Sequence, residues 1–82
     1  MPRVVVAGGD CARFTGGLVA FDVEADTVRR LIGELDARYP GFGDYIERRM
    51  AISIDGEIHQ DAGAVPLTPT SEVYLIPKIG GG

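Results

Sequence analysis

The chain has 82 residues, of which 45% are hydrophobic and 24% are charged. This length supplies one hydrophobic core, and the composition is typical of a folded globular domain, which argues against two domains and against a disordered chain. The formal net charge of −4 argues against a groove that follows nucleic-acid phosphates and favours a basic protein partner.

The chain has one cysteine, Cys11, and one histidine, His59, which form neither an internal disulfide nor a structural zinc site. A catalytic Cys–His pair is the alternative, but a plain loop cysteine and a solvent-facing strand histidine are the preferred interpretations. The apolar run that opens the chain is too short for a signal peptide or a membrane span. We therefore expect a cytoplasmic protein that binds no membrane, nucleic acid, metal or cofactor.

The first predicted element is a buried strand over 3–7, a β-branched run that two glycines end. A second strand over 18–23 places Val19, Phe21 and Val23 on one face. The intervening GGDCARFTGG is interpreted as a loop, with its glycines in turns. The two strands are expected to form an antiparallel hairpin.

A helix is predicted next, with an apolar stripe that faces the core. The residues of this stripe are Val28, Leu31, Ile32 and Leu35. Asp26 is placed to cap the first turn. Gly33 inside the helix costs about 1 kcal/mol relative to alanine, which predicts that another group packs closely there. Pro40 and Gly41 end the helix near Tyr39.

The last third of the chain contains mostly strands. The predicted elements are a short helical turn over 44–49 and strands over 50–54, 57–60 and 72–77. Asp55 and Gly56 give a strong signal for a two-residue hairpin turn. A crossing over 61–71, rich in glycine, proline and threonine, leads to the last strand.

The order β-β-α-β-β-β predicts an α+β fold of the β-grasp type, with a mixed sheet of four to five strands packed on one main helix. The first and last strands are expected to be parallel neighbours, so that the last strand lies at the centre of the sheet. We expect a β-grasp domain over 1–77 and a flexible C-terminal tail over 78–82 that ends in Gly-Gly.

The tail KIGGG is the least typical segment. Pro77 lacks an amide hydrogen, so we expect it to end strand pairing and to turn the chain away. From Lys78 to Gly82 an extended chain reaches roughly 17 Å, at about 3.4 Å per residue, which suffices to enter a partner's active site. Glycines have no Cβ, so this backbone fits a narrow channel. The alternative is an ordinary frayed chain end.

Three stretches are characteristic together: TVRRLIGELDARYPGF, the Asp-Gly hairpin and SEVYLIPKIGGG. On these stretches the whole chain resembles the ubiquitin-like ThiS/MoaD sulfur carriers. FTGG also resembles a loop of some members, including the carrier of mycobacterial cysteine synthesis. Gly81 and Gly82 fall on the diglycine of the family. Gly80, where serine or alanine is more usual, and Thr70-Ser71, where many relatives have Gly-Asp, depart from the pattern.

The resemblance implies that a ubiquitin-activating-type adenylyltransferase uses ATP to convert the Gly82 carboxylate to an acyl adenylate, with Gly81 beside it. A sulfur donor then replaces AMP and leaves a thiocarboxylate. A sulfur-accepting synthase would take this sulfur in the biosynthesis of cysteine, molybdopterin, thiamine thiazole or another thio-metabolite. The chain would thus be a carrier and not an enzyme. The alternative is a ubiquitin-like modifier that Gly82 joins to lysines.

The last strand also predicts where a partner docks. Val73 and Leu75 share one face, and Tyr74 and Ile76 share the other. If the helix covers the first pair, then Tyr74, Ile76 and Ile79 form an exposed docking patch beside the tail. The full set of expected partner contacts is Tyr74, Ile76, Pro77, Lys78, Ile79 and Gly80.

Other polar groups are interpreted as ordinary surface. Asp22, Glu24 and Asp26 alternate and could hold a divalent ion, but a solvated strand edge and a helix cap are preferred. Arg48 and Arg49 are interpreted as a solvated helix end rather than an RNA site. A third functional alternative is a non-covalent β-grasp binding domain with an inert tail.

Overall fold

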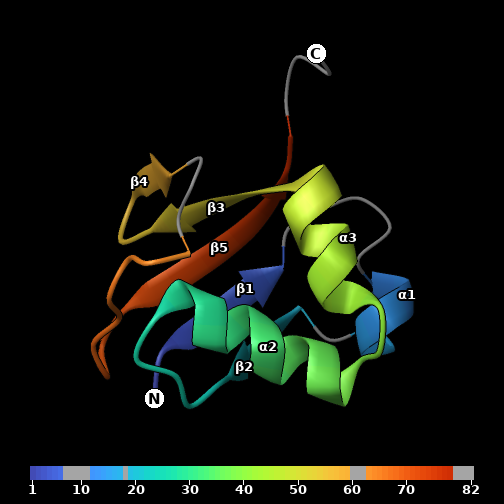
Figure 1. The fold of residues 1–82 in the computed structure, drawn as a ribbon, viewed down its shortest axis with the longest axis horizontal. Coiled ribbons are helices and arrows are strands. Elements are labelled where there is room, and N and C mark those ends of the chain that lie inside the picture. The colour runs from blue at the N-terminus through green and yellow to red at the C-terminus, as the bar shows by residue number, and fades with distance from the viewer. Residues whose placement is uncertain (7–11, 18, 60–62, 79–82) are drawn as a thin grey trace.

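The computed structural model describes residues 1–6, 12–17, 19–59 and 63–78. Its elements in chain order are β1 (Arg3–Val6), α1 (Ala12–Thr15), β2 (Ala20–Asp22), α2 (Val28–Arg38), α3 (Phe42–Arg49), β3 (Met50–Ile54), β4 (Glu57–His59) and β5 (Glu72–Pro77). The strands form a five-stranded sheet in the order β2-β1-β5-β3-β4, and α2 and α3 lie across one face of it (Figure 1). The predicted α+β fold of the β-grasp type is confirmed.

The central strand of the sheet is β5. It pairs parallel with β1, where Val4 lies opposite Val73, and antiparallel with β3. The predicted β1-β2 hairpin is also present, with Val4 opposite Phe21. A parallel pair requires a long crossover, and most of the chain between β1 and β5 supplies it. The last strand therefore lies where the sequence predicts it.

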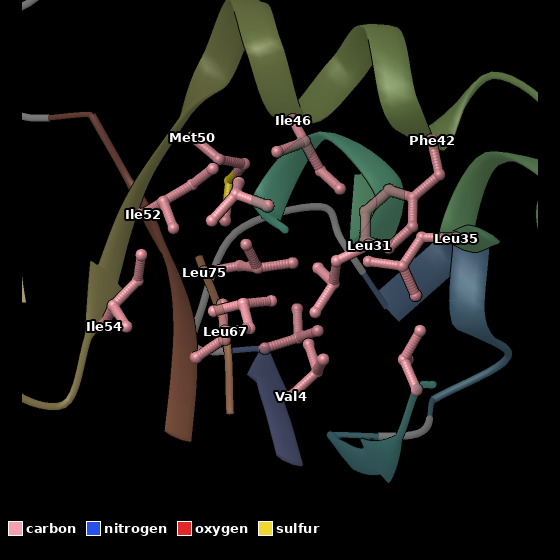
Figure 2. Packing of buried hydrophobic residues seen from close by; sticks show 14 residues of the cluster. Val4, Leu31, Leu35, Phe42, Ile46, Met50, Ile52, Ile54, Leu67 and Leu75 are labelled. Atoms are coloured by element: carbon pink, nitrogen blue, oxygen red, sulfur yellow. The ribbon is translucent and has the colours of Figure 1, made fainter. Parts of the chain in front are cut away.

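The core fills the space between the sheet and the two longer helices, and Figure 2 shows their side chains meeting in one layer. The core residues with no exposed surface are Val4, Val23, Val28, Leu31, Leu35, Phe42, Ile46, Val73 and Leu75. The predicted helical stripe is confirmed, with Ile32 packed at its border. Burial of this apolar layer is the main source of stability.

Helix α3 is longer than the turn predicted over 44–49. It begins after Gly41, whose φ of 93° is a left-handed conformation that favours glycine. The Oδ1 atom of Asp36 accepts hydrogen bonds from the amides of Gly41 and Gly43, at 3.1 and 3.0 Å. A helix of this length is marginal in isolation, so burial of Phe42 is what stabilises it.

The predicted loop between β1 and β2 contains the short helix α1. Phe14 of α1 stacks on Phe42, with ring centroids 5.1 Å apart, and contacts Tyr45 at the same distance. The guanidinium of Arg13 lies 5.5 Å from the Phe14 ring centroid. These ring contacts connect α1 to α3, a long-range interaction that local sequence signals do not contain.

Helix α2 corrects two predictions. The cap is Thr27, whose hydroxyl accepts from the Arg30 amide at 3.2 Å, and not Asp26. The carbonyl of Asp26 instead accepts from the Leu67 amide at 2.8 Å, which commits this residue to the neighbouring loop. Gly33 is exposed, and a Cβ there meets no described atom within 4 Å, so the predicted close packing is wrong.

The β3-β4 hairpin is confirmed and is joined to β5. Asp55 and Gly56 have φ angles of 49° and 90°, as a two-residue hairpin turn requires. The Oδ1 atom of Asp55 accepts from the Glu72 amide at 2.9 Å, and the Asp55 amide donates to the Glu72 carbonyl at 2.9 Å. The hairpin turn therefore fixes the start of the central strand.

Candidate functional site

The candidate site lies where β5 ends, next to the C-terminal end of α3 (Figure 1). Pro77 lies opposite Met50, and the Lys78 amide donates to the Arg49 carbonyl at 3.0 Å. Pro77 is the last paired residue of β5, so the expectation that it ends strand pairing is confirmed, and one further backbone hydrogen bond follows it. Successive amides point to opposite sides of a strand, so the missing donor of Pro77 faces β1, whose last described pair is Val6 with Leu75.

The side chain of Lys78 makes a second contact with α3. Its Nζ atom donates to the carbonyl of Glu47 at 3.1 Å. The last carbonyls of a helix lack partners within the helix, and a cation is favoured beside them. Main chain and side chain together hold Lys78 against α3, and we call this arrangement the Lys78 clamp. Sequence reasoning missed it because Glu47 and Lys78 are 31 positions apart.

The remaining predicted tail residues lie outside the described part of the chain. They are Ile79, Gly80, Gly81 and Gly82, and Cys11 also lies outside it. The division into a 1–77 domain and a 78–82 tail stays a prediction. Tyr74, Ile76 and Pro77 lie on the last strand, and Lys78, the first residue of the predicted tail, follows it directly.

The two faces of β5 differ as predicted. Val73 and Leu75 are completely buried under the helices. On the opposite face Tyr74 is 40% exposed and Ile76 is half-buried. The alternation of the strand therefore places an aromatic and an aliphatic side chain on the open face of the sheet.

The sheet register places two further apolar residues in the same cross-strand row as Tyr74. Tyr74 lies opposite Val5 of β1 and Ser53 of β3, and Ser53 in turn lies opposite Ile58 of β4. Ile58 is 62% exposed and Val5 is half-buried. We define the outer-face patch as Val5, Ile58, Tyr74 and Ile76. Sequence analysis missed Val5 and Ile58, although the Asp-Gly hairpin signal already places Ser53 opposite Ile58.

A groove of about 780 Å³ lies on the helix side of the β3-β4 edge. Its walls come from α2, α3, β3 and β4, and it reaches Pro77 and Lys78. The charged or polar side chains along it are those of Arg29, Glu47, His59 and Lys78. His59 is half-buried there, so it is less open to solvent than the sequence suggests.

The acidic and basic residues singled out above form ordinary surface. Within the described residues no group of three or more histidine, cysteine or acidic side chains could hold a metal ion. Arg48 forms an exposed ion pair with Asp44 at 3.1 Å, one helical turn away. In the same part of the chain, no helix is both long and apolar enough to cross a membrane.

Comparison with known proteins gives a family and a fold. The sequence model of the ThiS family matches residues 10–82. No curated protein matches the chain significantly. CysO of Mycobacterium tuberculosis, described as an antigen, is 19% identical with a TM-score of 0.84, over 96% of this chain and 100% of CysO.

Two further solved structures are similar. A chain of the Amycolatopsis orientalis BexX/CysO complex is 16% identical with a TM-score of 0.84, over 100% of both chains. SAMP1 from Haloferax volcanii is 21% identical with a TM-score of 0.67, over 99% of this chain and 98% of SAMP1. At these identities the structural likeness shows the fold alone. The family match, in contrast, covers most of the sequence, including its C-terminal glycines, and the chain therefore belongs to the ThiS family.

Proposed function

We propose that this ThiS-family sulfur carrier holds its sulfur as a thiocarboxylate on Gly82. The observation that carries the proposal is that the family match extends through Gly82, five residues after the end of the central strand, which the Lys78 clamp joins to α3. Carriers of this family have no catalytic role, so partner enzymes supply the chemistry. The core places the start of the tail, and the tail presents the acyl group.

The proposed chemistry has two steps at the Gly82 carboxylate. In the first, a carboxylate oxygen of Gly82 attacks the α-phosphorus of ATP and pyrophosphate leaves. In the second, a sulfur nucleophile attacks the acyl carbon, and AMP leaves with the electron pair of the broken C–O bond. A ubiquitin-activating-type adenylyltransferase would perform the first step. A sulfur-accepting synthase would use the resulting thiocarboxylate, and the identity of this synthase decides the pathway.

The reach of the tail limits how closely a partner must approach. With Lys78 tied to α3, four residues remain, and these span at most about 14 Å when extended, at about 3.4 Å per residue. The partner surface must therefore lie against the end of β5. The outer-face patch adjoins this end, and its Tyr74 and Ile76 provide the aromatic and aliphatic anchors that dominate many interfaces. We propose that the adenylyltransferase docks on this patch.

A ubiquitin-like modifier is the second candidate, and the fold likeness to SAMP1 leaves this role open. The activation step is common to both roles. They differ in the fate of the acyl group, which ends as a thiocarboxylate in a carrier and as an isopeptide bond to lysine in a modifier. Intact mass spectrometry separates the two, because a carrier gains only the mass difference between sulfur and oxygen.

The test is ATP–pyrophosphate exchange with the adenylyltransferases encoded in the same genome. The wild-type chain should support exchange, whereas a chain without Gly81 and Gly82 should not. One residue added after Gly82 should also abolish exchange. Unchanged thermal melting of both variants would show that the loss is chemical. Pyrophosphate exchange by the extended chain, without proteolytic removal of the added residue, would refute the role of Gly82. Full cellular function of the chain that lacks Gly81 and Gly82 would support a non-covalent binding domain instead.

A further inference from the structure

The 82 residues include seven arginines but only one lysine, Lys78. An arginine guanidinium stays protonated and does not act as a nucleophile at neutral pH, whereas a lysine amine attacks activated acyl groups. The chain thus has a single side-chain amine. This amine lies four positions before Gly82, closer in sequence to the proposed acyl group than any other ionisable side chain.

An amine in this position is a hazard for an activated carrier. If the Lys78 amine attacks the Gly82 acyl adenylate, a C–N bond forms and the C–O bond to AMP breaks. AMP leaves with the electron pair of that bond, and the nitrogen loses a proton to water. Within one chain the product is a lactam, and between two chains it is an isopeptide-linked dimer. Either product consumes the carrier before sulfur can be transferred.

The Lys78 clamp opposes both reactions. The amide and the Nζ atom of Lys78 are held at 3.0 and 3.1 Å from two carbonyls at the end of α3. The Nζ atom must leave the Glu47 carbonyl before it can reach an acyl carbon. Two contacts therefore hold the nucleophile at the end of α3.

The other cations of the chain add no competing amine. Among the exposed arginines is Arg48, which pairs with Asp44 through its Nε atom at 3.1 Å. Arg49 is exposed and has no hydrogen-bond or ion-pair partner through its side chain among the described residues. A lysine could supply the charge at either position, because Arg48 contacts Asp44 through Nε alone and Arg49 has no such contact in the described part of the chain, so neither uses the two-pronged geometry special to arginine. Arginine at these positions leaves the surface near the tail without a reactive amine.

We propose that Lys78 is a withheld amine, which the clamp on α3 keeps from attacking the activated carboxyl end of its own or a second chain. This inference rests on the proposed activation of Gly82 and adds how the activated chain escapes self-conjugation. It also identifies Lys78 as the one side chain through which the 82 residues could be joined to one another by an isopeptide bond.

The test uses the full chain prepared through an intein fusion as a C-terminal thioester of mercaptoethanesulfonate, which requires no activating enzyme. The thioester is incubated in mildly alkaline buffer, and hydrolysed, cyclic and dimeric products are followed by intact mass spectrometry. Lys78→Arg sets the background rate, to which the amino terminus contributes. Lys78→Arg combined with Arg49→Lys moves the single side-chain amine to a neighbouring position without the carbonyl contact.

We expect the rate at which the wild type cyclises and dimerises to lie within about twofold of the Lys78→Arg background. The double variant with Arg49→Lys should react about fivefold faster than the wild type, which is the factor that one hydrogen bond typically represents. Equal rates for wild type and the Arg49→Lys variant would overturn the proposal, whether both are fast or both are slow. Hydrolysis in every sample verifies that the thioester is reactive. Failure of pyrophosphate exchange would refute Gly82 activation separately, because this thioester forms without it.

Discussion

Replacement of Tyr74 by alanine tests whether the outer-face patch receives the adenylyltransferase. Tyr74 is 40% exposed, which corresponds to roughly 80 Å² of a tyrosine side chain of about 200 Å². Burial of that area at about 25 cal/mol per Å² contributes about 2 kcal/mol, or a factor of about 30 in affinity. Ordering and desolvation at the interface reduce this gain, so we expect a rise of about tenfold in KM.

The assay is pyrophosphate exchange as a function of carrier concentration. Only KM should rise, because Tyr74 lies outside the reacting group and its loss removes binding that ground state and transition state share. Tyr74→Phe keeps the ring and should stay close to wild type. Glu72→Ala is the matched control, since Glu72 is an exposed residue on the same face of β5, two positions earlier. A folded Tyr74→Ala variant with wild-type KM would refute docking on this patch.

Two further predictions concern stability and are measured by thermal and urea unfolding. Thr27→Ala removes the cap of α2 and should lower the free energy of unfolding by about 1 kcal/mol, or Tm by about 4–8 °C. Asp26→Ala should leave Tm nearly unchanged, and equal losses of Tm in the two variants would contradict the assignment of the cap. Gly33→Ala should stabilise the chain by up to about 1 kcal/mol, because no described atom lies near its Cβ. Gly43→Ala should destabilise the chain, because the new Cβ would lie 3.0 Å from Cβ of Asp36. An unchanged free energy of unfolding would show that α3 shifts freely to make room.

The candidate site could be predicted in part because strand alternation is a local property. Residues 72–77 form β5 with the predicted bounds, and the period of two alone places Tyr74 and Ile76 opposite Val73 and Leu75. Ile58 and Val5 were missed, since they join the patch through pairing across four strands. The Lys78 clamp was missed for the same reason, because its partners belong to a helix far away in the sequence.

The errors in the fold have a similar origin. Asp26 and Thr27 are both good capping residues, and the choice between them depends on the loop that binds the Asp26 carbonyl. Helix α3 has weak local signals, and its existence depends on burial of Phe42 and Ile46 against the sheet and α2. Helix α1 depends on ring stacking between Phe14 and Phe42. Each of these features is stabilised by contacts between residues that are distant in the chain.

The sequence by itself determined the strands, the main helix, the central place of the last strand beside the first, and the family, because hydrophobic periodicity, turn residues and the C-terminal motif are properties of consecutive residues. Tertiary structure alone decided which residue caps α2, how α1 and α3 pack, which side chains surround Tyr74, and how Lys78 is held at the end of α3. These features depend on the distances between segments that only the folded core brings together. The physical reason is that a hydrogen bond or a ring contact across the core requires a register, and the sequence specifies that register only through the fold as a whole.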